Sequence, residues 1–380
     1  MNPMRKVTFL LEEFATPSPS QQLLDRFLIG YSRNGAFHKP AIEEISAYLP
    51  PTNEGDFGMR REDFNLTIAP TVEQAVEGAD GVVIVARRPG ATANDRLAEI
   101  ALALAPEGAA CFIHGVLSSN LQRGRALAKM AAARRIALLA GTPLSVTWRL
   151  PEVKLPQDTA LSEALIVVQI NPPPNSSQTG PQGTLAGAEL SALEGLLPVI
   201  ERRRGGETGI RNVCLLEGDD VWRAGDRKLW SWPLLAAALS RSHSPQGDPV
   251  IDGRSQDIAG LGLVPKLARH PQAWLLEHND GLRTSILVLD GVVGDFNFAV
   301  RAADGRMFSA QLFRAPPPLE QHFSLLAAVM EDFFQTRKLP GPLERNLLIA
   351  GLLEAFRNPA TRAGKTITTP QLNIAYRFPS

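Results

Sequence analysis

The first 145 residues alternate apolar, strand-like runs with helix-like runs, and this alternation limits the folds open to the chain. Residues 81–85 (GVVIV) carry no polar side chain, which is typical of a strand buried on both faces. Such strands, alternating with helices, predict a doubly wound parallel sheet of the α/β class. The strands expected are residues 6–11, 42–49, 81–85, 109–114 and 136–140, and the helices 21–28, 71–77, 93–105 and 121–133.

The pattern changes in the second half of the chain. Residues 284–289, 296–301 and 308–313 are strand-like, and Asp-Gly pairs between them indicate turns, so we predict an antiparallel meander. Further strands are expected at residues 163–170 and 211–216, and helices at 188–203, 323–334 and 343–356. We therefore predict two domains. Residues 1–147 form a Rossmann-like α/β domain, and residues 148–380 form an α+β domain with a largely antiparallel open sheet.

Composition excludes several classes of protein. The chain has 39 Lys+Arg and 39 Asp+Glu, so it lacks the basic excess typical of nucleic-acid binding. No apolar run approaches the ~18 residues of a membrane-spanning helix. Cys111 and Cys214 are too few for a disulfide framework, and no His, Cys and carboxylate cluster has metal-ligand spacing. We expect a cytoplasmic protein that binds a small molecule, with no metal, nucleic-acid or membrane partner.

A parallel open sheet binds ligands beyond the carboxyl ends of its strands, and a dinucleotide site normally has a glycine-rich loop after the first strand. Here the sequence EEFATPSPS follows that strand, without a glycine. The second strand ends in Tyr-Leu-Pro-Pro rather than in an acidic residue. A phosphate could bind at the helix cap near Ser18, or at Arg87 and Arg88. The alternative for the two arginines is a solvated loop.

Several segments carry a resemblance to a known family. They are residues 71–85 (TVEQAVEGADGVVIV), 127–151, 201–210 (ERRRGGETGI), 333–355 and 366–376 (TITTPQLNIAY). In these segments the chain resembles the Gfo/Idh/MocA oxidoreductases, the family of glucose–fructose oxidoreductase and inositol dehydrogenase. The resemblance implies NAD or NADP as cofactor and a sugar- or polyol-like substrate. It also implies a homo-oligomer or mixed oligomer formed through the open face of the second-domain sheet.

The chain departs from the family where the chemistry takes place. The family's Glu-Lys-Pro triplet after the fifth strand corresponds to His114, Gly115 and Val116, so glycine replaces the lysine. The histidine on the first helix of the second domain corresponds to Ser191, and an isolated serine is no general base near neutral pH. Two functions therefore stay open: an NAD(P)-dependent oxidoreductase, and a catalytically silent relative that binds a ligand or pairs with an active subunit.

Four residues are candidates for catalysis or cofactor binding. His114 could replace the missing acid–base group, and the alternative is a hydrogen-bonded loop histidine. Glu194 could act as a base, and the alternative is a carboxylate on a helix surface. Gly115 and Gly141 follow neighbouring strands and are expected beside the cofactor.

A second group of residues is expected to meet the substrate. Thr142, Trp148 and Arg149 lie at the domain junction, where Arg149 could clamp a carboxylate or phosphate or form an interdomain salt bridge. Arg202 and Arg203 precede a Gly-Gly pair and could form an anion site. They could equally pair with the carbonyl groups at the C-terminal end of a helix. The glycines favour that structural role, because they fall where the helix has to end.

Three tryptophans, at positions 222, 230 and 232, cluster in the sequence VWRAGDRKLWSW. Tryptophans interleaved with basic residues can stack on sugars or bases. Packing in a core or interface is their more common role, and we predict it here.

Overall fold

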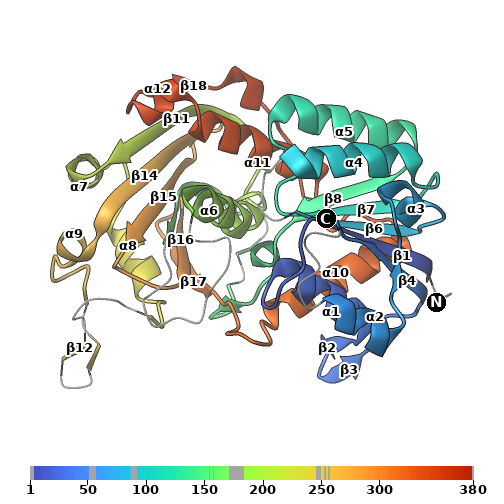
Figure 1. Cartoon of the computed structure of the whole chain (residues 1–380). Helices are drawn as coiled ribbons and strands as arrows, with labels where there is room; N and C mark the ends of the chain where they lie inside the picture. The colour runs from blue at the N-terminus through green and yellow to red at the C-terminus, as the bar shows by residue number, and fades with distance from the viewer. Residues whose placement is uncertain are drawn as a thin grey trace. The chain divides into compact units, whose positions relative to one another are not determined.

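The computed structural model describes residues 4–50, 57–86, 92–153, 155–156, 158–170, 184–244, 250–251, 254–255 and 257–378. Among these, the chain divides into two compact units (Figure 1). Unit 1 contains the residues up to Val146 together with Ala315–Ala350, and unit 2 contains the rest. The chain first leaves unit 1 after Val146 and returns to it at Ala315, so unit 1 is not one continuous stretch of the sequence. The expected division at residue 147 stays a prediction.

Unit 1 is built on a parallel sheet of six strands in the order β5-β4-β1-β6-β7-β8. The predicted doubly wound sheet is therefore confirmed: the chain runs outward from β1 on one side and returns to start again at β6 on the other. Ligand sites in such sheets lie beyond the strand ends at this reversal. The strands are β1 (Met4–Leu11), β4 (Ile42–Tyr48), β5 (Thr67–Ile68), β6 (Gly81–Val85), β7 (Ala110–His114) and β8 (Ala137–Gly141).

Helices cover both faces of this sheet (Figure 1). One face packs on α3 (Val72–Val76), α4 (Thr92–Leu104) and α5 (Leu121–Ala133). The other packs on α1 (Pro19–Leu28), with α2 (Phe57–Phe64) nearby, and on α10 (His322–Thr336).

Helix α10, near the C-terminal end of the sequence, belongs to unit 1 because its apolar side chains pack against α1. The ring of Phe334 contacts the ring of Phe27 in α1 with centroids 6.2 Å apart, and both side chains are fully buried. Tyr31 in the small hairpin of β2 (Tyr31–Arg33) and β3 (Ala36–His38) donates a 2.6 Å hydrogen bond to Glu331 of the same helix. Apolar burial over this face thus depends on a segment some 300 residues away in sequence.

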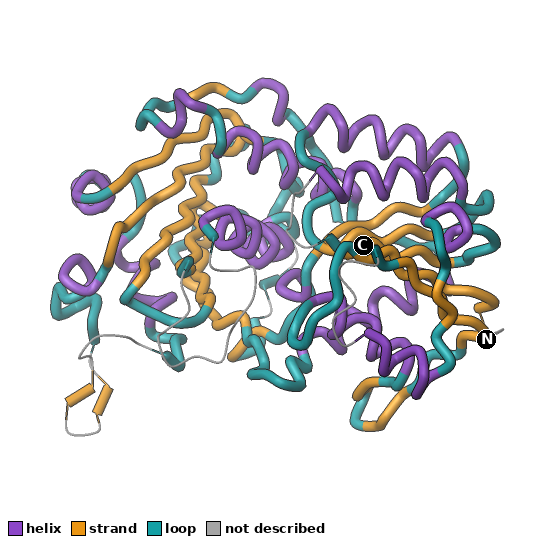
Figure 2. Tube along the Cα trace, viewed as in Figure 1, coloured by secondary structure: helices purple, strands orange, loops and turns teal. Residues whose placement is uncertain are grey.

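Unit 2 is built on an eight-stranded sheet in the order β18-β11-β14-β15-β10-β16-β17-β9. Figure 2 shows the strands of the chain in orange and the helices in purple. Its neighbouring strands run antiparallel, except that β10 and β15 are parallel. The largely antiparallel sheet is confirmed. The strands are β9 (Arg149–Leu150), β10 (Leu161–Val168), β11 (Ile210–Glu217), β14 (Arg269–His278), β15 (Arg283–Asp290), β16 (Phe296–Ala302), β17 (Met307–Leu312) and β18 (Ile367–Thr368).

The predicted meander of the last three long strands is wrong. Strand β10 lies between β15 and β16, so only β16 and β17 form a hairpin. Residues Ala164 to Val168 of β10 are buried on both faces, which requires a central place in the sheet. Strand β14 was not predicted, although it pairs with both β11 and β15.

Both faces of the unit 2 sheet carry helices. On one face lies α6 (Leu185–Ile200), which contacts β10, β15 and β16. The opposite face carries α7 (Asp219–Asp226), α8 (Trp232–Leu239) and α9 (Val264–Leu267). The remaining helices are α11 (Leu343–Phe356), whose residues fall in both units, and α12 (Pro359–Arg362) in unit 2. The sheet is open at its two edges, but neither of its faces is bare.

Candidate functional site

The loop that follows β1 does not form the usual phosphate cradle. It contains no glycine, and its Phe14 is only 2% exposed and packs against Phe57 with ring centroids 5.2 Å apart. The guanidinium of Arg60 lies 5.1 Å from the centre of the same ring. A glycine-rich loop would let the backbone approach a pyrophosphate closely. This loop instead contributes an aromatic side chain to the hydrophobic core of unit 1.

Ser18 is the N-cap of α1. Its Oγ accepts a 3.2 Å hydrogen bond from the N–H of Gln21, and its carbonyl accepts another from Gln22. Pro19, the first helical residue, has no N–H to offer. The helix terminus is therefore largely satisfied by its own cap, which leaves few donors for an anion.

His114 ends β7 and is 93% buried, since its relative exposure is 7%. Its ring stacks on Phe323 of α10 with centroids 6.2 Å apart, and its Nε2 has no hydrogen-bond partner among the described residues. Burial lowers the pKa of the imidazole to about 4. The ring is thus neutral at pH 7 and can form one further hydrogen bond, but its pKa is far below that of an efficient general base.

Gly115 and Gly141 connect the ends of β7 and β8. The N–H of Gly115 donates a 2.9 Å hydrogen bond to the carbonyl of Gly141. Gly115 has φ +96°, a conformation that side chains rarely adopt. Glycine is therefore required by the backbone at the position where the resemblance places a lysine.

The structure adds two residues that the sequence did not single out, Asn94 and Asp95 in the first turn of α4. Asn94 is 1% exposed, and neither polar atom of its amide has a partner among the described residues. Asp95 is fully buried and accepts hydrogen bonds from the N–H and hydroxyl of Ser119, after β7, with Arg123 3.5 Å away. These contacts tie the start of α4 to the loop after β7. The carboxyl edge of β6 and β7 thus carries two buried polar side chains, Asn94 and His114, with unused hydrogen-bonding capacity.

The expected substrate residues fall in both units. Thr142, in unit 1, precedes a short 3₁₀ turn (Pro143–Ser145), and its carbonyl accepts a 2.8 Å hydrogen bond from Ser145. Trp148 and Arg149 belong to unit 2. Trp148 is 40% exposed and contacts Phe313 with ring centroids 6.1 Å apart, while Arg149 begins the edge strand β9.

Glu194 is not on the surface of its helix, as one of the two alternatives supposed. It is 1% exposed within α6. Glu189 on the same helix is equally buried and lies 3.0 Å from Arg362. Burial raises the pKa of Glu189 to about 7, against the opposing effect of Arg362. The helix thus places two carboxyl groups inside unit 2.

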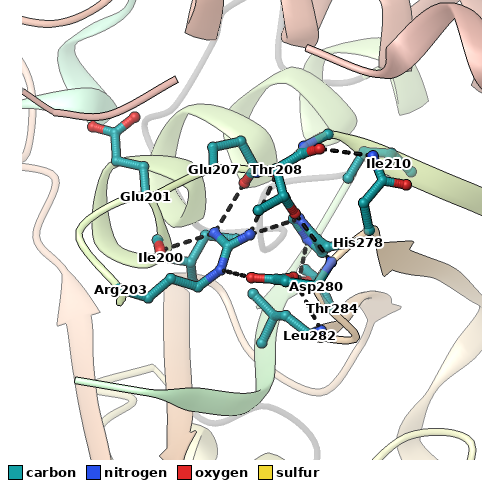
Figure 3. A network of polar contacts seen from close by, with 12 residues as sticks. Ile200, Glu201, Arg203, Glu207, Thr208, Ile210, His278, Asp280, Leu282 and Thr284 are labelled. Atoms are coloured by element: carbon teal, nitrogen blue, oxygen red, sulfur yellow. Dashed lines mark hydrogen bonds and ion pairs between the residues drawn. The ribbon is translucent and has the colours of Figure 1, made fainter. Parts of the chain in front are cut away.

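Arg203 belongs to an internal polar network (Figure 3). Its Nε donates to Asp280 at 2.8 Å, and its Nη1 donates to Glu207 at 3.0 Å and to the carbonyl of Ile200 at 3.0 Å. The side chain is 1% exposed. The guanidinium therefore ties a helix end to two later segments of unit 2, in line with the structural interpretation of this string.

Glu207 is the acceptor at the centre of the same network. It takes hydrogen bonds from the N–H groups of Thr208 and Gly209 at 2.9 and 2.8 Å, and lies 2.8 Å from His278 Nδ1. Burial alone would raise its pKa, but His278 and Arg203 outweigh this and hold the pKa of Glu207 well below its usual range.

For the remaining candidate residues the structure gives only single observations. The guanidinium of Arg202 stacks on Phe378 at 3.9 Å from the ring centre. Arg87 and Arg88 lie outside the described residues. Burial raises the pKa of the Cys111 thiol to about 12, which makes it unreactive. Among the described residues, no group of His, Cys, Asp and Glu could hold a metal ion. A search of the same residues finds no helix long and apolar enough to cross a membrane.

Comparisons with known proteins identify the fold. No protein-family model matches the chain, and no curated protein matches it by sequence. Among solved structures, GenD2 from gentamicin A biosynthesis, in complex with NAD, is 12% identical, with 97% of each chain covered and a TM-score of 0.60. The myo-inositol dehydrogenase from Lactobacillus casei, in complex with NAD(H) and myo-inositol, is 12% identical over 96% of this chain and 97% of its own, with a TM-score of 0.57. A probable dehydrogenase from Thermotoga maritima is 10% identical over 97% and 99%, with a TM-score of 0.58. The chain therefore has the two-domain fold of these dehydrogenases over nearly its full length.

Proposed function

We propose that this protein is an NAD(P)-dependent oxidoreductase of the Gfo/Idh/MocA type that acts on a sugar- or polyol-like small molecule. The observation that carries the proposal is the fold shared over nearly the whole chain with NAD-bound GenD2 and with an inositol dehydrogenase bound to NAD(H) and myo-inositol. A fold sets the prior for a function, and the site has to support it.

The nicotinamide end of a cofactor fits the residues present. A nicotinamide carboxamide offers both a donor and an acceptor, and the side chain of Asn94 can pair with both. His114 Nε2 adds one more hydrogen bond at the end of the neighbouring strand. Both groups are more than nine-tenths buried and have no partner among the described residues, a costly arrangement unless a ligand satisfies them.

The pyrophosphate end does not fit the usual place. The loop after β1 has no glycine and contributes Phe14 to the core, and Ser18 already caps α1. We therefore assign the cofactor phosphates to Arg87 and Arg88, which follow β6 in sequence and lie outside the described residues.

The remaining roles divide between positioning and proton transfer. Bound NAD(P) would supply hydride transfer. We assign Thr142, Trp148 and Arg149 to substrate binding. Of the two acid–base candidates we keep Glu194, because the lowered pKa of His114 suits hydrogen bonding better than proton abstraction. Glu194 lies three positions after Ser191 and therefore near the same face of α6.

We keep a second function as an alternative. Gly115 stands where the resemblance places a lysine, and no glycine-rich loop follows β1. Both features fit a catalytically silent relative that binds a small ligand or pairs with an active subunit.

Calorimetric titration with NAD, NADH, NADP and NADPH tests the proposal, followed by a turnover assay with a panel of inositols and sugars. Micromolar binding, about −8 kcal/mol, together with turnover would support the oxidoreductase. Binding without turnover on any polyol would favour the silent relative. No binding of the four nucleotides at millimolar concentration would reject the oxidoreductase.

A further inference from the structure

Helices of unit 2 cover both faces of its sheet. We infer that α7, α8 and α9, here called the cover, occupy the sheet face where a second subunit could otherwise dock, so that this face is not an interface between subunits. The inference does not depend on the proposed function, since it concerns only the packing within unit 2.

The strand register places an apolar surface on this face. Ala273 of β14 and Val167 of β10 both lie opposite Leu287 of β15, and Leu165 lies opposite Ala299 of β16. Each of these side chains is at most 1% exposed. A continuous apolar face of this kind has to be buried against another layer.

The cover supplies that layer. Val221 of α7, Leu234 and Leu235 of α8 and Val264 of α9 join the five sheet residues in one buried cluster. The cover is thus part of the core of unit 2 rather than a loosely attached insertion.

The cluster is built around Trp230, which is 2% exposed. Its indole donates a 2.7 Å hydrogen bond to the carbonyl of Val221, and its ring contacts Trp232 with centroids 4.6 Å apart. Gly225 allows this packing, because a Cβ there would lie 2.6 Å from the indole. The predicted core role of the tryptophans thus takes a particular form: they fix the cover in place.

Polar contacts hold the C-terminal end of α8 on the sheet. Asp295, just before β16, accepts hydrogen bonds from the hydroxyl of Ser242 at 2.9 Å and from the N–H of His243 at 2.8 Å. Asn297 and Gln311 in the sheet donate to the same carboxylate at 2.5 and 2.6 Å. Asp295 therefore joins the cover to β16 and β17.

The N-terminal end of α8 is held as well. Ser231 caps the helix by accepting the N–H of Leu234 at 3.3 Å, and its hydroxyl also accepts a 3.0 Å hydrogen bond from Arg301 of β16. Arg283 of β15 donates at 3.0 Å to the carbonyl of Lys228, between α7 and α8. Both ends of the helix are fastened to the strands below it.

The part of the face next to the cover is charged. Glu277, Arg283, Glu163 and Arg301 follow one another across β14, β15, β10 and β16 in register. Glu163 forms ion pairs with both arginines, at 3.1 Å to Arg301. Charged residues are depleted in the cores of protein interfaces, and alternating charges across strands stabilise one another.

The other face of the sheet is closed by α6, where Gly195 lies against Leu312 and Ile166. Since both faces are thus buried by the chain itself, an oligomer formed through the face of this sheet would first have to displace the cover.

Sedimentation analysis of the full chain over a wide concentration range tests the inference, with three variants. Glu277→Lys alters a side chain that is 40% exposed, at one end of the charged row, whose described partners Arg211 and Asn212 lie on β11, and it should leave the sedimenting mass unchanged. Asp295→Ala removes the carboxylate that holds α8 and should cause concentration-dependent association through the uncovered face. Asp304→Ala, which removes a carboxylate that is 54% exposed between β16 and β17, is the control and should behave as the wild type.

Hydrogen exchange of the same samples covers the case in which Asp295→Ala fails to fold. A 41.2 kDa species with protected amides in α8 supports the inference, and so does a wild-type oligomer that Glu277→Lys leaves intact. A wild-type dimer that Glu277→Lys converts to monomer would overturn it. Unprotected α8 amides in the monomer would overturn it too.

Discussion

The N–H of Gly115 donates a 2.9 Å hydrogen bond to the carbonyl of Gly141, and this contact fixes the strand ends beside which a nicotinamide would lie. It requires Gly115 at φ +96°. Replacement of the lysine by glycine therefore changes the backbone conformation as well as removing the side chain. The backbone at this edge has a shape that a lysine would strain.

Gly115→Lys, which restores the family's residue type at a buried position, should destabilise the protein by at least about 1–3 kcal/mol, the usual cost of a side chain at positive φ, because burial of the ammonium adds to that cost. Chemical denaturation measures the change. Ala103→Lys, on the exposed side of α4, is the control and should change stability by about 0.5 kcal/mol or less. Equal effects of the two substitutions would show that Gly115 is not conformationally required.

His114 should make stability depend on pH. Its pKa falls from 6.5 to about 4 on folding, so the folded state binds fewer protons than the unfolded state between these values. The stability is fully present above pH 6.5 and is lost as the pH falls towards 4, by on the order of 2–3 kcal/mol. In His114→Phe the unfolding free energy should lack this component. His243→Gln, at an exposed position, should keep the wild-type profile, and identical profiles for all three proteins would contradict the prediction.

The polar network of unit 2 should be sensitive to loss of its acceptor. Glu207→Gln leaves Arg203 buried beside fewer negative charges, and breaking a buried pair in this way costs about 3–5 kcal/mol. Urea unfolding of Glu207→Gln measures the loss. Glu277→Gln, which alters an ion pair that is 53% and 40% exposed, is the matched control and should cost at most about 1 kcal/mol. A small effect at Glu207 would mean that the network contributes little to stability.

Local patterns in the sequence predicted the local elements well, because burial and helix caps leave periodic traces. The five long strands of unit 1 and the cap at Thr71 are examples. The place of β10 between β15 and β16 depends on pairing across more than 100 residues, which no short window contains. The return of α10 to unit 1 is a non-local feature of the same kind.

In the candidate site, too, the sequence predicted local features and missed those that depend on the tertiary structure. His114 could be found from its position at the end of a strand, but its lowered pKa depends on burial that only the tertiary structure reveals. Asn94 was missed because an amide near the start of a helix is common in sequences. What distinguishes it is that both of its polar atoms are buried without a partner among the described residues.

Asn94 therefore offers a test in which stability and binding should move in opposite directions. Asn94→Leu replaces an unpaired amide by an apolar group of similar size, which should raise the unfolding free energy of the free protein by about 1 kcal/mol or leave it unchanged. If the amide binds a nicotinamide carboxamide, the same variant should weaken dinucleotide binding about tenfold or more, since a hydrogen-bonded pair is lost in a buried site. Denaturation and calorimetric titration on one preparation measure both. Ser119→Ala, which alters the neighbouring contact with Asp95, is the control and should lower stability instead. A variant that is less stable and binds as tightly as the wild type would show that the Asn94 amide serves the fold and not the ligand.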